Sequence, residues 1–383
     1  MRPIRVLMVI DSISDTAGGA ERFVVGLAKA MAGEGYEVLV ATTRQASGEL
    51  MGQLDAAGVA HVDVVRRSRF DVPNLWRLFR SLRRERIDVL HANKYGSNVW
   101  AVIFGRLARV PVVIAQEHTW AYSGERVRPF LDGRLIGPLS DAFVAVSTAD
   151  RDRMISLEGV RPEKIEMIPT AYIPREGADG ADLRIELGLD PATPLVGTVA
   201  VLRPQKALGV LLEAFAILAR ERDAPHLVIA GTGVSEAELH AQAASLGLSG
   251  RIHFVGLRQD VNAVWQSLDV GAISSDFEGT PIAALEAIFN STPLVTTSVG
   301  GLPDLIDDGV SGLLVPPQDP AALAAGIQRL LDDPSEREAM AAAARERLGD
   351  YSLDRLVARM GDLYRRLLER PGRRAARARR EAG

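Results

Sequence analysis

Short runs of apolar, often β-branched residues alternate with segments of helical period along almost the whole chain of 383 residues. In the helical segment 20–31, for example, Phe23, Leu27 and Met31 fall on one face. Apolar strands that alternate with helices are typical of parallel sheets covered by helices on both sides. The expected strands are 4–10, 37–41, 59–65, 88–91, 112–115 and 142–146, then 195–201, 227–230, 252–255, 270–273 and 294–296.

The alternation stops at residues 169–180, which contain two prolines and two glycines, as a linker would. The chain is long enough for two domains of about 150 to 200 residues each. We therefore expect an α/β protein of two doubly wound domains, residues 1–170 and 171–350. Segment 351–369 is a helix long enough to return to the first domain, and 370–383 is a basic tail.

Composition narrows the class of protein. The chain has no cysteine, which removes disulfides, thiolate catalysis and zinc–cysteine sites and fits a reducing compartment. No apolar run approaches the roughly 18 residues that a membrane span needs, and the first one reaches Asp11 too early for a signal peptide. These features predict a cytoplasmic protein.

In open α/β sheets, ligands bind outside the carboxyl ends of the strands, so residues that directly follow a strand are candidates for a site. Gly18 and Gly19 follow the first strand and lead into a helix, where bare amides can face an anion; the alternative is a flexible loop with a glycine turn. His118 follows strand 112–115 and can bond a substrate hydroxyl, or it is a loop histidine bonded to backbone. His91, also at a strand end, is expected to be structural.

Two cations, Arg203 and Lys206, lie between strand 195–201 and an amphipathic helix. They can neutralise a phosphate leaving group, and they oppose the helix dipole unless an anion binds between them. The alternative is a solvated pair of charges.

The stretch "SSDFEGTPIAALEA", residues 274–287, places Glu278 and Glu286 on either side of a predicted helix start. We expect Thr280 as the cap and Pro281 as the first helical residue, so that Gly279 and the first turn present amides to a phosphate. Side chains tilt toward the helix N-terminus, so Glu286 can reach back to the same ligand and accept two hydroxyls of a ribose or sugar. The alternative is a capping acid plus an exposed helix acid.

No metal site is expected. Asp150 and Asp152 have the spacing of a metal-binding pair, but Ser147 to Asp150 is typical of a helix cap. Leaving-group charge would then be met by Arg203, Lys206 and helix amides.

In these motifs the sequence resembles the retaining, nucleotide-sugar-dependent glycosyltransferases of family four, which have the GT-B fold of two Rossmann-like domains facing a cleft. The similarity covers most of the chain: "GGAE" at 18–21, "DVLH" at 88–91, "QEHT" at 116–119, "RPQKALGVLLEAF" at 203–215, "LVIAGTG" at 227–233, Glu278-x7-Glu286, and "TSVGGLPDLIDDGVSGLLVPP" at 297–317.

The resemblance implies roles for five residues. Glu278 would contact the transferred sugar, Glu286 the ribose, Lys206 the diphosphate, Gly19 the phosphates and His118 the sugar in the catalytic centre.

The chain departs from the family pattern at three places. Ala200-Val201 stands where Gly-Arg is common, so the usual phosphate arginine is missing from its place, and Arg203 is the nearby candidate. Pro169-Thr-Ala171 stands where Pro-Asn-Gly is usual, and Asp304 where Glu is commoner.

The resemblance further implies a nucleoside-diphosphate sugar as co-substrate, held mainly by the second domain, and an acceptor held mainly by the first. Closure of the cleft would exclude water, the anomeric configuration would be retained, and no cofactor or metal would be required. The acceptor is a glycan, a lipid-linked molecule or a small molecule. Base, sugar, acceptor and oligomeric state stay open.

Three other functions fit the same fold: a nucleotide-sugar epimerase, a phosphorylase, and a nucleotide-sugar- or polysaccharide-binding protein without turnover. The missing arginine favours the last, whereas His118, Glu278 and Glu286 together argue against it.

Two basic segments remain. Residues 74–86 place Leu75, Leu78, Phe79 and Leu82 on one helix face and Arg77, Arg80, Arg83 and Arg84 elsewhere, as in a helix on an anionic membrane or a sheet-packed helix with a solvated basic side. The arginine-rich tail can add weak peripheral contact at the inner membrane face, or it is a disordered solvated end. Nucleic acid is not an expected partner, because no aromatic residues interleave with the tail arginines and the net charge is −4.

Overall fold

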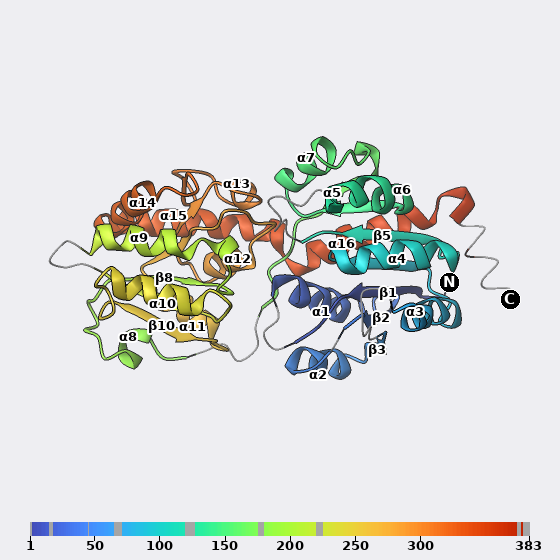
Figure 1. The fold of residues 1–383 in the computed structure, drawn as a ribbon, viewed down its shortest axis with the longest axis horizontal. Helices are drawn as coiled ribbons and strands as arrows, with labels where there is room; N and C mark the ends of the chain where they lie inside the picture. Colours follow the sequence, from blue (N-terminus) through green and yellow to red (C-terminus); the bar gives the residue numbers. More distant parts are fainter. Residues whose placement is uncertain are drawn as a thin grey trace. The chain divides into compact units, whose positions relative to one another are not determined.

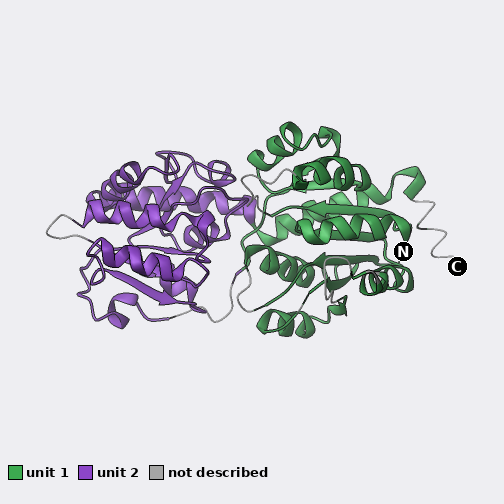
Figure 2. Cartoon of the chain, viewed as in Figure 1, with its two compact units in different colours: residues 1–173, 352–383 green, residues 174–351 purple. Residues whose placement is uncertain are grey.

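The computed structural model describes residues 2–14, 18–44, 46–64, 71–118, 127–174, 180–219, 225–373 and 377. The chain divides into two compact units, residues 1–173 with 352–383 and residues 174–351 (Figure 2). The boundary falls inside the expected linker, of which 175–179 lie outside the described residues.

The described part of the first unit contains a parallel sheet of seven strands in the order β3-β2-β1-β4-β5-β6-β7 (Figure 1). The strands are β1 (Ile4–Ile10), β2 (Tyr36–Thr42), β3 (Ala60–Asp63), β4 (Val89–Asn93), β5 (Val112–Gln116), β6 (Ala142–Ala145) and β7 (Ile165–Met167). The helices are α1 (Gly19–Met31), α2 (Glu49–Ala56), α3 (Val72–Arg84), α4 (Tyr95–Leu107), α5 (Val127–Leu131), α6 (Gly137–Leu139), α7 (Thr148–Ser156) and α16 (Leu353–Leu368), with a short π-helix η1 (Asp132–Ile136) and a 3₁₀ turn η2 (Pro162–Lys164).

The described part of the second unit contains a parallel sheet of six strands in the order β10-β9-β8-β11-β12-β13. The strands are β8 (Leu195–Val199), β9 (His226–Ala230), β10 (Ile252–Gly256), β11 (Val270–Ile273), β12 (Leu294–Thr297) and β13 (Leu313–Val315). The helices are α8 (Leu183–Glu186), α9 (Leu208–Leu218), α10 (Glu236–Ser245), α11 (Val261–Ser267), α12 (Ile282–Phe289), α13 (Leu302–Leu305), α14 (Pro320–Asp332) and α15 (Pro334–Glu346), with short turns η3 (Pro204–Lys206) and η4 (Arg347–Tyr351).

The first sheet is covered on both faces, as its apolar strands predict. Along β1, Val6 and Met8 pack in one buried cluster with α1 and α16, while Leu7 and Val9 pack in a second with α3 and α4. Because successive strand residues point to opposite faces, a fully apolar strand supplies both clusters. The two doubly wound α/β domains predicted from the sequence are therefore confirmed.

The return of the C-terminal helix to the first unit is also confirmed. Met360, Tyr364 and Leu367 of α16 are buried in the cluster with α1. The Tyr364 hydroxyl lies 2.7 Å from Nδ1 of His91, whose Nε2 lies 2.9 Å from Oε1 of Gln116. Burial lowers the pKa of His91 to about 4, so this histidine is a neutral structural residue, as expected.

The predicted strands differ from the structure in two missed strands and in several strand ends. The sequence pattern missed β7 and β13, because three-residue strands are too short to show a period. The strand expected at 195–201 ends at Val199.

Two arginines in the described part of the basic tail pair with aspartates of the first unit. Arg373 Nη2 lies 2.6 Å from Asp141, and Arg377 Nε lies 3.8 Å from Asp88. Both aspartates are buried and directly precede a strand, so the arginines neutralise carboxylates at the amino edge of the sheet. Residues 374–376 and 378–383 lie outside the described residues.

Candidate active site

The order of strands determines where the site residues lie. Strand order reverses between β1 and β4 in the first sheet, and between β8 and β11 in the second. Loops that leave the carboxyl ends of such neighbouring strands turn to opposite faces of the sheet, which makes this the usual ligand position in open α/β folds. The candidates on the Lys206 and Glu278 loops follow β8 and β11.

In the second unit these two loops meet in an ion pair. Lys206 Nζ lies 2.5 Å from Oε1 of Glu278, and the hydroxyl of Ser275 donates to the same oxygen at 2.6 Å. The Glu278 side chain is buried and that of Lys206 is half-buried. Two of the three residues predicted to be catalytic, Lys206 and Glu278, are therefore brought together, and the positive charge of Lys206 is met by a carboxylate.

Close backbone packing fixes the Glu278 loop. Gly300 has a φ of +56°, and a Cβ atom there would lie 1.8 Å from the carbonyl oxygen of Glu278. The amide of Gly301 donates to the carbonyl of Gly279 at 2.9 Å. The Gly-Gly-Leu-Pro motif thus packs against the backbone of Glu278 and Gly279. No side chain fits at the first position of the motif, Gly300.

A second glycine pair fixes the loop that carries the cations. A Cβ atom on Gly231 would lie 1.8 Å from the carbonyl oxygen of Ala200, and one on Gly233 would lie 2.2 Å from that of Leu202. The "AGTG" turn after β9 therefore packs directly on the backbone that leads to Lys206.

Helix α12 begins one residue later than expected. Pro281 is the N-cap, with no capping side-chain bond, and the helix starts at Ile282; the prediction of Thr280 as cap and Pro281 as first helical residue is wrong. Glu286 is the fifth helical residue and is 3% exposed. The alternative of a capping acid plus an exposed helix acid is therefore wrong as well.

The two cations before α9 differ. Arg203 is exposed, and its side chain makes no hydrogen bond or ion pair within the part of the chain that the structure describes. The solvated alternative thus describes Arg203 but not Lys206.

Ala207, next to Lys206, has left-handed backbone angles of φ 44° and ψ 39°. A Cβ atom is unfavourable in this region, whereas glycine adopts it freely at some cost in unfolded-chain entropy. We expect Ala207→Gly to raise the free energy of unfolding by about 1 kcal/mol, measured by urea denaturation with an unchanged slope.

The matched control is Ala216→Gly, the same change inside α9. It should lower the free energy of unfolding by about 1 kcal/mol, because glycine is a poor helix former. A loss of stability in both variants would contradict strain at Ala207.

In the first unit, the predicted His118 is oriented by Asn93. Nε2 of His118 lies 2.9 Å from Oδ1 of Asn93, whose amide nitrogen donates to the carbonyl of His91 at 3.3 Å. The ring of Phe23 meets His118 edge-on, with centroids 4.8 Å apart. Burial, with smaller effects from Lys94 and His91, lowers the pKa of His118 well below its usual value, so the ring is neutral and Nδ1 can accept a hydrogen bond.

Gly18 and Gly19 begin α1 beside a charged pair. Gly18 is the N-cap and has a φ of −79°, which residues other than glycine also adopt. Its backbone conformation therefore does not require the alternative of a glycine turn. Lys94 pairs with Glu21 of the same helix turn. Lys94 has a φ of +72°, which is strained for a side chain of this size and is typical of functional positions.

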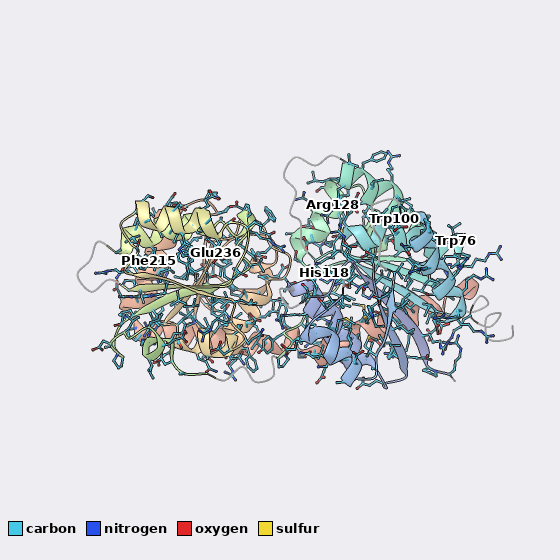
Figure 3. All side chains as sticks on the ribbon, turned by 60° about the horizontal axis from the view of Figure 1, so that its bottom comes forward. Trp76, Trp100, His118, Arg128, Phe215 and Glu236 are labelled. Atoms are coloured by element: carbon cyan, nitrogen blue, oxygen red, sulfur yellow. The ribbon has the colours of Figure 1, made fainter. Side chains whose placement is uncertain are left out.

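Glu117, next to His118, belongs to a buried charge cluster. It accepts from Arg128, which is labelled in Figure 3, at 2.6 Å and from Asn98 at 2.8 Å. Both Glu117 and Arg128 are nearly inaccessible to solvent. Burial raises the pKa of Asp132 to about 9 and that of Glu158 to about 8. The cluster connects the end of β5 to the start of α5.

The sequence reasoning missed Asn93, Lys94, Ser275 and Arg128. Asn93 is the last residue of β4 and Lys94 directly follows it, at the point where strand order reverses, so the rule applied to the other strand ends would have found them. Arg128 carries no such signal.

The acidic spacing at Asp150 is a helix cap, as expected, because Ser147 accepts from the amide of Asp150 at 3.1 Å. Among the described residues, no group of three or more metal-ligating side chains lies together.

Comparisons with known proteins identify the family of this chain. Residues 181–347 match the family model described as glycosyl transferases group 1, and residues 17–174 match that of glycosyltransferase family 4. A D-inositol 3-phosphate glycosyltransferase of Frankia alni is 32% identical over 82% of this chain and 86% of its own. Another, from Streptomyces bingchenggensis, is 29% identical over 91% of this chain and 84% of its own.

A solved structure with the same fold is Anabaena Alr3699/HepE in complex with UDP and glucose. It has a TM-score of 0.82 and 21% identity, and the alignment covers 94% of this chain and 99% of that one. The chain therefore belongs to the family 4 glycosyltransferases of GT-B fold, and it is an enzyme of the glycosyltransferase type.

Proposed function

We propose that this enzyme transfers a sugar from a nucleoside-diphosphate sugar to an acceptor hydroxyl, with retention of anomeric configuration and without a metal ion. The observation that carries the proposal is the Lys206–Glu278 ion pair beside the start of α12, with Glu286 buried one turn further on. Cation, helix start and two buried acids are the groups that a diphosphate and two sets of sugar hydroxyls require.

Each group has a role in this scheme. Lys206 and the first amides of α12, which lack intrahelical partners, bind the diphosphate and stabilise the charge on the leaving phosphate. Glu278 accepts from hydroxyls of the transferred sugar, and Glu286 from the ribose. Arg203 is exposed and has a long side chain, and it adds a second positive charge beside the phosphate.

The first unit supplies the acceptor side. Neutral His118, with Nε2–H held by Asn93, presents Nδ1 to a substrate hydroxyl. Gly18 and Gly19 let a phosphate approach the amides of α1. As the new C–O bond forms, the bond to phosphate breaks, and the acceptor proton passes to the departing phosphate oxygen.

The relatives guide the choice of substrates. UDP is the first nucleotide to test, because UDP occupies the structural neighbour, and inositol phosphate is the first small acceptor to test, because curated relatives carry that name.

The test is a thermal-shift panel of UDP, GDP, ADP and TDP, each with and without magnesium. A ligand at 100 times its dissociation constant stabilises the folded protein by about 2.7 kcal/mol, so a clear rise in melting temperature is expected for one base, unchanged by magnesium. No shift with any nucleotide would overturn the proposal. A shift without transfer to any acceptor would favour the binding-protein alternative, and consumption of the donor without an acceptor would favour the epimerase.

A further inference from the structure

The outward face of helix α3 is positively charged. Its residues Val72–Arg84 contain four arginines and no acid. Leu78 and Leu82 are buried against the sheet, as expected, while Arg77, Arg80, Arg83 and Arg84 are exposed; the Leu75 side chain lies outside the described residues. At about 100° per residue, the four arginines fall within an arc of roughly 120° on the side away from the core.

The charge of this face is largely unneutralised. Arg84 pairs with Glu85, but Arg77, Arg80 and Arg83 form no ion pair or hydrogen bond with any described residue. Segment 66–86 contains eight arginines and two acids in a chain whose net charge is −4. An anionic partner is the complement of such a face.

An aromatic side chain lies on the same arc. Trp76, labelled in Figure 3, is 43% exposed, and its ring stacks on Phe79 with centroids 4.5 Å apart. Arg83 lies over the Phe79 ring at 6.0 Å. A solvated basic face requires no tryptophan, whereas tryptophan beside arginine is the combination enriched at the boundary between water and lipid.

We propose that this outward face of α3, formed by Trp76, Arg77, Arg80, Arg83 and Arg84, docks on an anionic lipid bilayer. The arginines bind phosphate head groups, and the Trp76 ring enters the interface beside them. None of the described helices is long and apolar enough to span a bilayer, so the contact is peripheral. The proposal does not depend on the proposed reaction.

The experiment is flotation of the purified full chain with vesicles of phosphatidylcholine, with and without phosphatidylglycerol. We expect binding only to the anionic vesicles, falling as salt rises. Arg77→Gln/Arg80→Gln/Arg83→Gln should weaken it by roughly tenfold or more, and Trp76→Ser by roughly threefold or more.

The control removes three arginines elsewhere on the chain, Arg161→Gln/Arg345→Gln/Arg359→Gln, and should bind like the wild type. Equal binding to neutral vesicles, equal loss in the control, or no binding by the wild type would overturn the proposal. Retention on an RNA column that depends on the same arginines, without vesicle binding, would assign the face to nucleic acid instead. Nucleotide thermal shifts in all variants report the donor site separately, so the two proposals fail independently.

Discussion

Replacing Lys206 with alanine is expected to lower the rate of sugar transfer by about 10³-fold. Lys206 is the only described cation paired with Glu278, at 2.5 Å, and in the proposed reaction it meets the charge that develops on the leaving phosphate. An interaction that strengthens in the transition state should reduce kcat, and KM should change less. Steady-state kinetics with the nucleotide sugar found in the thermal-shift panel would measure this.

Arg203→Ala is the matched control, because it removes the same charge from the same loop at an exposed position. We expect a loss of less than about tenfold, as for an exposed charge that acts through solvent. Glu278→Gln keeps the shape of the acid. It should reduce the rate of transfer as Lys206→Ala does, because the two side chains act as a unit. Full activity of Lys206→Ala, or an equal loss in Arg203→Ala, would refute the assignment.

Most of the fold could be predicted because apolar strands and helical periods repeat over long distances in the chain. The strands of four or more residues were all found, whereas β7 and β13 were missed because three residues give no period. The start of α12 was one residue off, since Thr280 and Pro281 both suit a helix start and only packing decides between them.

Part of the candidate site could be predicted as well, because the order of strands decides where its loops lie. Lys206 and Glu278 lie in the loops that follow β8 and β11, the two strands that flank the reversal of strand order, so topology brings these loops to the same place. The Glu117–Arg128 pair lies beyond such a rule. The segment between its partners includes residues 119–126, which lie outside the described residues, and the meeting of Glu117 and Arg128 depends on tertiary packing that no spacing in the sequence encodes.

The buried Arg128 has the largest expected effect on stability. Arg128→Met should lower the free energy of unfolding by about 3 to 5 kcal/mol near pH 8, because it leaves Glu117 buried without its cation. In the variant, burial raises the pKa of Glu117 further above its usual value. A carboxyl whose pKa is raised by folding favours the folded state only while it is protonated, so the loss should shrink toward pH 5. Urea denaturation at both pH values measures the difference.

Glu158→Gln should act in the opposite direction. Burial raises the pKa of Glu158 to about 8, so in the wild type its ionisation costs stability as pH rises from about 5 through 8. The glutamine variant does not titrate and should gain on the wild type over that range, by up to about 1.4 kcal/mol per pH unit.

The control for Arg128→Met is Arg134→Met, at an exposed position two turns from Arg128. It should change the free energy of unfolding by less than about 0.5 kcal/mol at either pH. If Arg128→Met behaved like Arg134→Met, or if its cost were the same at both pH values, Glu117 would not depend on Arg128 for its charge, and the buried cluster would hold the end of β5 by packing alone.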